Sequence, residues 1–154
     1  MLKAVLLLLA IPAVILSADH KAMTRVAVGD AFPSIEGLAG KEGAKATVVA
    51  VPGGPEWMNE MFAGDLKNDF APGYADAGVK FVTLAGPALG DKVASLSIDE
   101  AKLSEALGEG RGPRVYVLDA SGKVAWFDIE YSLSTHRELH AALGELTGTA
   151  TKHE

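Results

Sequence analysis

The sequence contains no cysteine, and this absence excludes a whole class of chemistry. A chain without thiols forms no disulfide and no sulfenic acid, so it carries out no thiol-disulfide exchange by itself. The absence would be unusual in an exported protein, because exported proteins are free to use disulfides and commonly do so.

Runs of lysine or arginine are also missing. The 14 basic residues are outnumbered by 20 acidic ones, which gives a formal net charge of −6. Because phosphate binding depends on clustered positive charge, we expect no nucleic-acid partner. The length of 154 residues and the 49% hydrophobic content suit one domain with an ordinary core.

No apolar run reaches the roughly 20 residues of an ordinary transmembrane helix. The longest, from Ala4 to Leu16, contains Pro12 and is typical of the hydrophobic region of a secretory signal. We expect residues 1–18 to be a signal peptide and 19–25 a short linker. The protein would then be exported to the periplasm or the extracellular space, with no stable membrane span after signal removal. An uncleaved anchor and a packed N-terminal strand are the alternatives.

Hydrophobic patterning over residues 26–147 predicts one domain, followed by a polar tail at 148–154. The predicted element order is β-α-β-α-β-β-α, which favours an α/β fold with a central mixed sheet and helices on both faces. The predicted elements are an extended lead-in at 26–43, a central strand at 45–51, a helix from Pro55 that ends at Pro72-Gly73, a strand at 79–85, a helix started by the capping box Ser97–Glu100, a hairpin of 114–119 and 123–129, and a last helix started by Thr135 and Glu138.

The stretch VPGGPEW joins the first predicted strand to the first predicted helix. Gly53 and Gly54 permit a sharp turn, and Pro55 suits the first helical position. Ligands and reactive groups are often placed where a strand runs into a helix N-terminus. Two interpretations stay open, a turn that binds an anion or a peptide and a purely structural connection.

Four segments in this order resemble the thioredoxin-like superfamily, in particular its redoxin branch, which includes envelope thiol-disulfide reductases and peroxiredoxin relatives. They are VGDAFP (28–33), ATVVAVPGGPEW (46–57), GPRVYVLDASGKVAW (112–126) and the capped helix at 135–146. The resemblance spans most of residues 26–146. It implies a thioredoxin-like fold with a central mixed sheet flanked by helices on both faces.

The resemblance also implies where an active site would lie. The family's W-C-x-x-C motif, or its single peroxidatic cysteine, stands at the N-terminus of the helix after the first strand, where the helix dipole stabilises a thiolate. Here the two cysteine positions fall at Glu56 and Asn59. The family's cis-proline matches Pro113, and Gly112 departs from the side-chain-bearing residue often found before it. Family members hold extended substrate peptides in the groove between these segments.

We therefore expect a non-catalytic binding or accessory protein, a pseudoenzyme whose partner is a protein or an extended peptide. A redoxin-family oxidoreductase by descent, with cysteine-independent or partner-assisted activity, is the second interpretation, and an assembly role is the third. We assign no catalytic residue, metal or cofactor, and the sequence does not give the oligomeric state. The candidate binding residues are Gly53, Gly54, Pro55, Glu56, Trp57, Asn59, Gly112 and Pro113.

Two polar patterns near the C-terminus suggest other chemistry. His136 and His140 are four residues apart on the last predicted helix and share a face, as zinc ligands do. Spacing fixes no third ligand, so a solvated helix face is the favoured interpretation. The polar stretch 128–136 invites a hydrolase interpretation, but it contains no G-x-S-x-G elbow, and its Ser134 and Thr135 suit a helix start.

Overall fold

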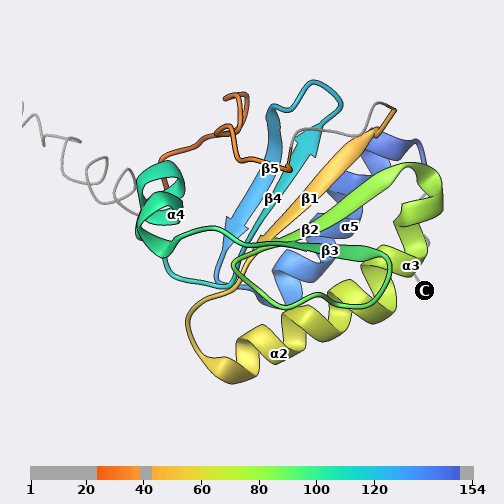
Figure 1. Cartoon of the computed structure of the whole chain (residues 1–154). Helices are drawn as coiled ribbons and strands as arrows, with labels where there is room; N and C mark the ends of the chain where they lie inside the picture. The colour runs from red at the N-terminus through yellow and green to blue at the C-terminus, as the bar shows by residue number, and fades with distance from the viewer. Residues whose placement is uncertain (1–23, 39–42, 150–154) are drawn as a thin grey trace, which may run out of the picture.

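The computed structural model describes residues 24–38 and 43–149. Its centre is a five-stranded mixed sheet in the order β3-β2-β1-β4-β5, with helices on both faces (Figure 1), which confirms the predicted α/β architecture. The predicted signal peptide, most of the linker and the end of the tail lie outside the described residues. In chain order the elements are β1 (Ala46–Val51), α2 (Glu56–Asp65), the π-helical segment η1 (Leu66–Phe70), α3 (Ala71–Tyr74), the 3₁₀ segment η2 (Ala75–Ala77), β2 (Val79–Leu84), β3 (Val93–Leu96), α4 (Glu100–Leu107), β4 (Arg114–Asp119), β5 (Val124–Ile129) and α5 (Leu133–Thr147).

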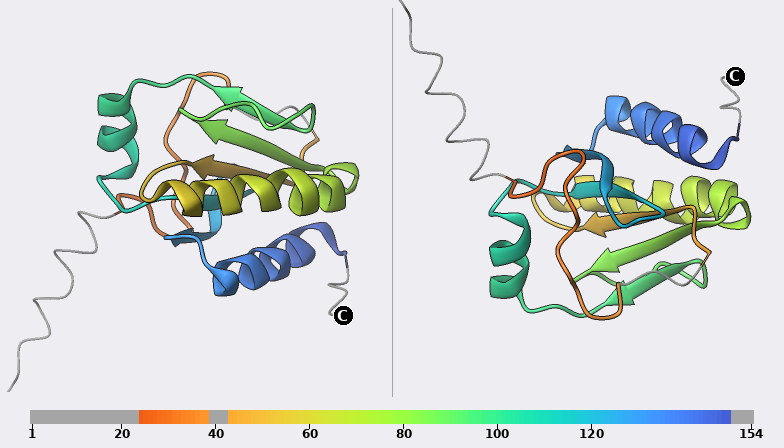
Figure 2. Two further views of the ribbon diagram at one scale, coloured as in Figure 1. Left: turned by 90° about the horizontal axis from the view of Figure 1, so that it is seen from below. Right: turned by 90° about the horizontal axis from the view of Figure 1, so that it is seen from above.

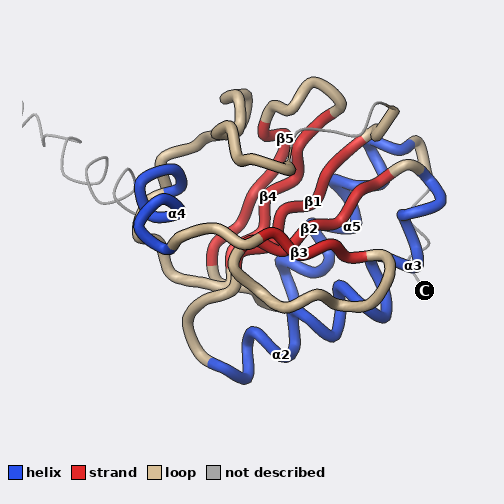
Figure 3. Tube along the Cα trace, in the orientation of Figure 1, coloured by secondary structure: helices blue, strands red, loops and turns tan. Residues whose placement is uncertain are grey.

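Strand β1 lies at the centre of the sheet, as its apolar run predicts, and all six of its residues are buried. It pairs in parallel with β2 and antiparallel with β4, and β4 and β5 form the predicted hairpin. Figure 3 shows these strands in red, crossing the middle of the molecule. Because Val51 at the end of β1 pairs with Arg114 at the start of β4, the turn after β1 lies beside Gly112 and Pro113.

Two apolar cores cover the two faces of the sheet. On one face, side chains of α2, η1 and α5, among them Phe62, Phe70 and Leu139, pack against β1, β2 and β4. On the other face, Leu107 of α4 and Ile35 of the lead-in pack against the same strands. Figure 2 shows the run from α2 to α3 and helix α5 side by side on one side of the sheet.

Strand β3 is absent from the sequence prediction. It spans the four residues VASL at the sheet edge, paired in parallel with β2, and only Val93 is fully buried. A short strand with two exposed residues has too little apolar alternation to stand out from a loop. The observed order is therefore β-α-β-β-α-β-β-α, with one strand more than predicted.

Both predicted capping boxes are placed wrongly by a few residues. The N-cap of α4 is Asp99, whose Oδ1 accepts hydrogen bonds from the backbone N–H groups of Ala101 and Lys102 at 3.0 and 3.3 Å. The N-cap of α5 is Ser132, which forms a capping box with Thr135 at the third helical position. The observed cap lies two residues after the predicted Ser97 in α4 and three residues before the predicted Thr135 in α5, and each cap side chain satisfies orphan N–H groups of the first turn.

The helical run that starts with α2 continues past Pro72 and Gly73, where the sequence predicts its end. In η1 the backbone widens, and the N–H of Ala71 bonds to the carbonyl of Leu66. Proline has no N–H and crowds the carbonyl four residues earlier, so an α-helix does not pass through it unchanged. The wider π-turn immediately before Pro72 accommodates this loss, and the run ends at Gly78, which has a φ of 95°.

The buried Arg114 connects β4 to α4. Its Nη1 donates hydrogen bonds to the carbonyls of Leu107 and Gly108, each at 3.1 Å. These are the orphan carbonyls at the C-terminus of α4, where a positive charge also suits the helix dipole. Among the described residues, the helices are all too short or too polar to cross a membrane.

Candidate functional site

The turn after β1 and the loop before β4 contact each other through their backbones. Gly54 has a φ of 69°, and a methyl group on it would overlap the carbonyl oxygen of Gly112. A methyl group on Gly112 would lie 2.7 Å from Cα of Gly53. Glycine is therefore required at both positions, and this contact leaves no room at position 112 for a side chain.

The peptide bond between Gly112 and Pro113 is cis, as the resemblance implies. Both residues are buried, whereas Gly54, Pro55 and the first residues of α2 are exposed. The structure thus brings the two halves of the predicted site together, with the proline underneath and the helix start on the surface.

Asn59 stands at the position of the family's second cysteine and holds the turn in place. Its Oδ1 accepts a hydrogen bond from the N–H of Gly53 at 2.9 Å, and its Nδ2 donates one to the carbonyl of Pro55 at 3.1 Å. The side chain therefore fixes both ends of the Gly-Gly-Pro turn from the first turn of α2.

Trp57 is the exposed feature of the site. The residue is 61% exposed, although tryptophan is usually largely buried. Glu56 precedes it at the start of α2, and Pro55 gives this helix end no side-chain cap. A carboxylate there is favoured by the helix dipole, by about 0.3–1 kcal/mol.

Further residues that the sequence analysis did not select surround the turn. Arg111 and Glu130 form an exposed ion pair at 3.0 Å next to Gly112. An apolar cavity of about 180 Å³ adjoins the turn on the other side. Its lining includes Pro52, Asn59, Phe62, Thr83, Pro87 and Leu89. Pro87 and Leu89 come from the loop after β2, which carries no motif.

Tyr131 anchors the far end of α2. Its buried hydroxyl donates a hydrogen bond to Oδ2 of Asp65 at 2.8 Å, and its ring packs 4.4 Å from that of Phe62. Burial and the neighbouring Asp65 carboxylate raise the pKa of Tyr131 well above its usual range, so the hydroxyl remains a donor. The orientation of α2, and hence of Trp57, depends on this contact.

The polar stretch 128–136 surrounds the start of α5 and caps this helix. Thr135 is buried, and its hydroxyl donates to Oδ2 of Asp128 at 2.7 Å, while Ser132 and Ser134 bond to each other. His136 does not join this group but turns toward Asp69.

Asp69 also contacts His140. The two histidines therefore share one carboxylate partner, which their spacing in the sequence does not reveal. Burial by itself would raise the pKa of Asp69, but hydrogen bonds and charge interactions with His140 and His136 outweigh it and hold the pKa below its ordinary value. The interpretation of His136 and His140 as a plain solvated face is therefore incomplete.

No protein-family model matches the sequence, and no curated protein matches it. Solved structures do match. A thiol:disulfide interchange protein from Bacteroides sp. aligns with 82% of this chain and 94% of its own, with a TM-score of 0.57 and 14% identity. A putative thiol:disulfide interchange protein DsbE from Chlorobium tepidum aligns with 80% of this chain and 99% of its own, with a TM-score of 0.56 and 16% identity.

A peroxiredoxin-like protein from Aquifex aeolicus aligns with 79% of this chain and 88% of its own, with a TM-score of 0.56 and 16% identity. These similarities show a fold, and they confirm the one that the sequence motifs predict. The chain has a thioredoxin-like fold, and it has no cysteine with which to perform thiol redox chemistry.

Proposed function

We propose that this cysteine-free protein of thioredoxin-like fold is a non-catalytic binding protein that holds a protein or an extended peptide at the turn from Gly53 to Trp57 and the adjoining Gly112–Pro113. The observation that carries the proposal is the exposure of Trp57 at this turn. Tryptophan is enriched among the residues that dominate binding energy at interfaces, where its ring buries a large apolar area.

The surroundings of Trp57 support a peptide-like partner. An exposed apolar side chain at the turn and an exposed ion pair next to Gly112, Arg111 with Glu130, would suit an interface with an apolar centre and a polar rim. Glu56 adds a negative charge at the helix start. A partner segment with an apolar residue and a nearby basic residue would suit this arrangement.

The proposal is tested by affinity capture from envelope extract with the wild-type protein and a Glu56→Ala, Trp57→Ala double variant. We expect a partner that the wild type retains and the double variant loses. Val28→Ala is the matched control, because Val28 is 62% exposed on the lead-in, away from the turn. Capture that survives the double variant, or that Val28→Ala also abolishes, would contradict this location.

A partner-assisted oxidoreductase role is the second candidate, and it is favoured by the similarity of the fold to thiol:disulfide interchange proteins. In that role a cysteine-bearing partner supplies both thiols, and this chain presents the substrate. The test measures thiol-disulfide exchange in an envelope fraction with and without the purified protein. A rate that does not depend on the added protein would exclude this role.

Export is part of the proposal, because binding to an envelope partner requires it. The apolar segment at 4–16 supports it as a signal. N-terminal sequencing of the protein recovered from the envelope fraction tests the expected cleavage after residue 18. Recovery of uncleaved protein from the cytoplasm would contradict it.

A further inference from the structure

Three side chains with metal-binding atoms meet between η1 and α5. Oδ2 of Asp69 lies 2.9 Å from Nε2 of His136 and 2.9 Å from Nε2 of His140. One ligand atom from each residue can be chosen so that all three lie within 4.8 Å of one another. Two imidazole nitrogens and one carboxylate oxygen are a ligand set that divalent transition metals such as zinc prefer.

The two histidine rings are held in place by the helix and by the core beneath them. His136 and His140 are one helical turn apart on α5, so they share a face. The fully buried ring of Phe70 lies under both, with ring centroids 5.0 Å from His136 and 4.5 Å from His140. A site whose ligands are already oriented loses little conformational entropy when an ion binds.

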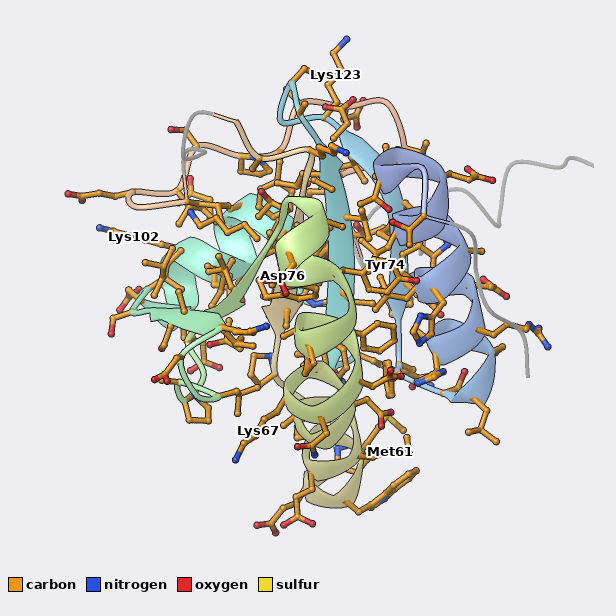
Figure 4. The ribbon with its side chains drawn as sticks, turned by 90° about the vertical axis from the view of Figure 1, so that its right-hand side faces the viewer. Met61, Lys67, Tyr74, Asp76, Lys102 and Lys123 are labelled. Atoms are coloured by element: carbon orange, nitrogen blue, oxygen red, sulfur yellow. The ribbon has the colours of Figure 1, made fainter. Side chains whose placement is uncertain are left out.

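Tyr74 orients His140 from the other side. Its hydroxyl lies 3.0 Å from Nδ1 of His140 and donates a hydrogen bond to the backbone carbonyl of the same residue at 3.2 Å. Figure 4 shows Tyr74 between α3 and α5, whereas Lys67 projects from the opposite side of the helical run. Metal-binding histidines commonly have their second ring nitrogen held in this way.

This hydrogen-bond pattern has a consequence for Nε2 of His140. When the single hydroxyl proton of Tyr74 goes to the carbonyl, Nδ1 of His140 carries a proton and donates it to the tyrosine oxygen. A ring that donates from Nδ1 to Tyr74 can present the lone pair of Nε2 to a metal ion, on the side where Asp69 lies.

Distances and exposure suit an ion with one open coordination position. Ligand atoms at about 2.0–2.2 Å from a tetrahedral zinc ion lie about 3.3–3.6 Å apart. Here the two oxygen–nitrogen distances are 2.9 Å, and all three ligand atoms lie within 4.8 Å of one another, so small side-chain shifts would suffice. The side chains of Asp69, His136 and His140 are 48%, 33% and 24% exposed, so water can reach the cluster.

We propose that Asp69, His136 and His140 bind one divalent transition-metal ion of the zinc class, with water as the fourth ligand and Tyr74 as a positioning residue. The site is built from residues outside the turn between β1 and α2, so it stands whether or not that turn binds a partner. Three protein ligands and an open position are the arrangement of zinc sites that bind a further ligand.

The first test titrates the purified, metal-free protein with Zn²⁺ by calorimetry, with Co²⁺ as a visible-absorption reporter of the coordination geometry. We expect one saturable site in the wild type and an affinity about ten-fold lower or worse in Asp69→Asn and in His136→Gln. Glu145→Gln is the matched control, because it removes one exposed carboxylate from the same helix without touching the cluster. It should bind like the wild type.

Either of two results would overturn the proposal. One is the absence of saturable binding of one ion by the wild type, which would leave Asp69, His136 and His140 as a hydrogen-bonded cluster. The other is unchanged binding in both ligand variants, which would place the ion on other residues, such as His20 or His153. Circular dichroism verifies that each variant folds, and His136→Gln carries the test if Asp69→Asn does not fold.

The role of Tyr74 has its own measurement. Tyr74→Phe removes the hydroxyl that orients His140 but leaves the ring and all three ligands. We expect about a ten-fold loss of Zn²⁺ affinity and a changed Co²⁺ absorption band, since outer partners of metal-bound histidines have effects of this size. Wild-type affinity with an unchanged band would remove Tyr74 from the site.

Discussion

The turn after β1 and the cluster of Asp69, His136 and His140 lie along the same helical run but are built from different parts of the chain. In the turn, backbone contacts between glycines and a cis-proline set the shape, and Asn59 secures it. In the cluster, His136 and His140, which follow Asp69 by 67 and 71 residues, converge on one oxygen of its carboxylate. The turn keeps the resemblance to a redox family without its reactive groups, whereas the cluster has reactive groups that the resemblance does not imply.

Among variants that distinguish the two regions, we expect the largest loss of stability from Gly54→Ala. The added methyl group would overlap the carbonyl of Gly112 and strain a left-handed backbone, so we expect a loss of about 3 kcal/mol in the free energy of unfolding. Gly90→Ala is the control, because Gly90 has a φ of 81° with open space around it and should lose only about 1 kcal/mol. Urea unfolding measures both, and equal losses would mean that the contact with Gly112 is not tight.

A second variant tests the anchor of α2, on which both regions depend. Tyr131→Phe removes the donor to the Asp65 carboxylate and should lower the free energy of unfolding by about 2 kcal/mol. Tyr116→Phe is its matched control, because the buried hydroxyl of Tyr116 has no hydrogen-bond partner among the described residues and its removal should be neutral or stabilising. A larger loss in Tyr116→Phe than in Tyr131→Phe would refute this assignment.

A third variant affects the turn alone. Asn59→Ala leaves the N–H of Gly53 without its acceptor, so we expect a loss of about 1 kcal/mol and faster amide hydrogen exchange at Gly53. Asn68→Ala, at an exposed position on the same run, should change neither. Asn59 and Asp69 are ten residues, or about 15 Å, apart along the run, so Asn59→Ala should leave Zn²⁺ binding unchanged.

The smallest effect concerns the β4–β5 turn, where a carboxylate rather than glycine contacts sets the shape. Hydrogen bonds from the Ser121 hydroxyl and from backbone N–H groups of Lys123 and Ser121 hold the pKa of Asp119 below its ordinary value. A lowered pKa stabilises the fold above about pH 4 and ceases to do so as the pH falls through it.

Asp119→Ala should therefore lower the free energy of unfolding at pH 7 by less than ~1 kcal/mol, because water screens this exposed carboxylate, and by less still at pH 3. Unfolding of wild type and variant at both pH values measures the difference. A difference that grows on acidification would reverse the predicted sign. The Gly54→Ala loss involves no titratable group and should stay constant over the same range.

The sequence predicts the parts of this fold whose signals are local. The apolar run of β1, the β4–β5 hairpin and the turn at Gly53–Pro55 are each specified by neighbouring residues, and all three are found. Edge strand β3 is too short and too exposed to stand out. Pro72 indicates a helix end, but the π-turn before it absorbs the missing hydrogen bond, and tertiary packing of Phe70 and Tyr74 continues the run.

The two candidate sites also differ in how far local sequence signals identify them. Glycine, proline and the start of a helix identify the turn from the sequence. Its closeness to Gly112 is implied by the resemblance alone, and the pairing of β1 with β4 produces it. The spacing of His136 and His140 shows a shared face. Asp69 could not be joined to them, because the direction of its side chain depends on the π-turn and on how the helical run packs beside α5 on one face of the sheet.

The hydrogen bonds of Asn59 bear on whether a redox centre could be introduced into this protein. Cysteine at positions 56 and 59 would create a C-x-x-C spacing at the start of α2. The thiol at position 59, however, is a much weaker acceptor than the amide for the N–H of Gly53, and it cannot reproduce the bond to Pro55. Two substitutions would therefore supply the thiols while loosening the turn that must hold them, so a working redox centre would require changes in the turn as well.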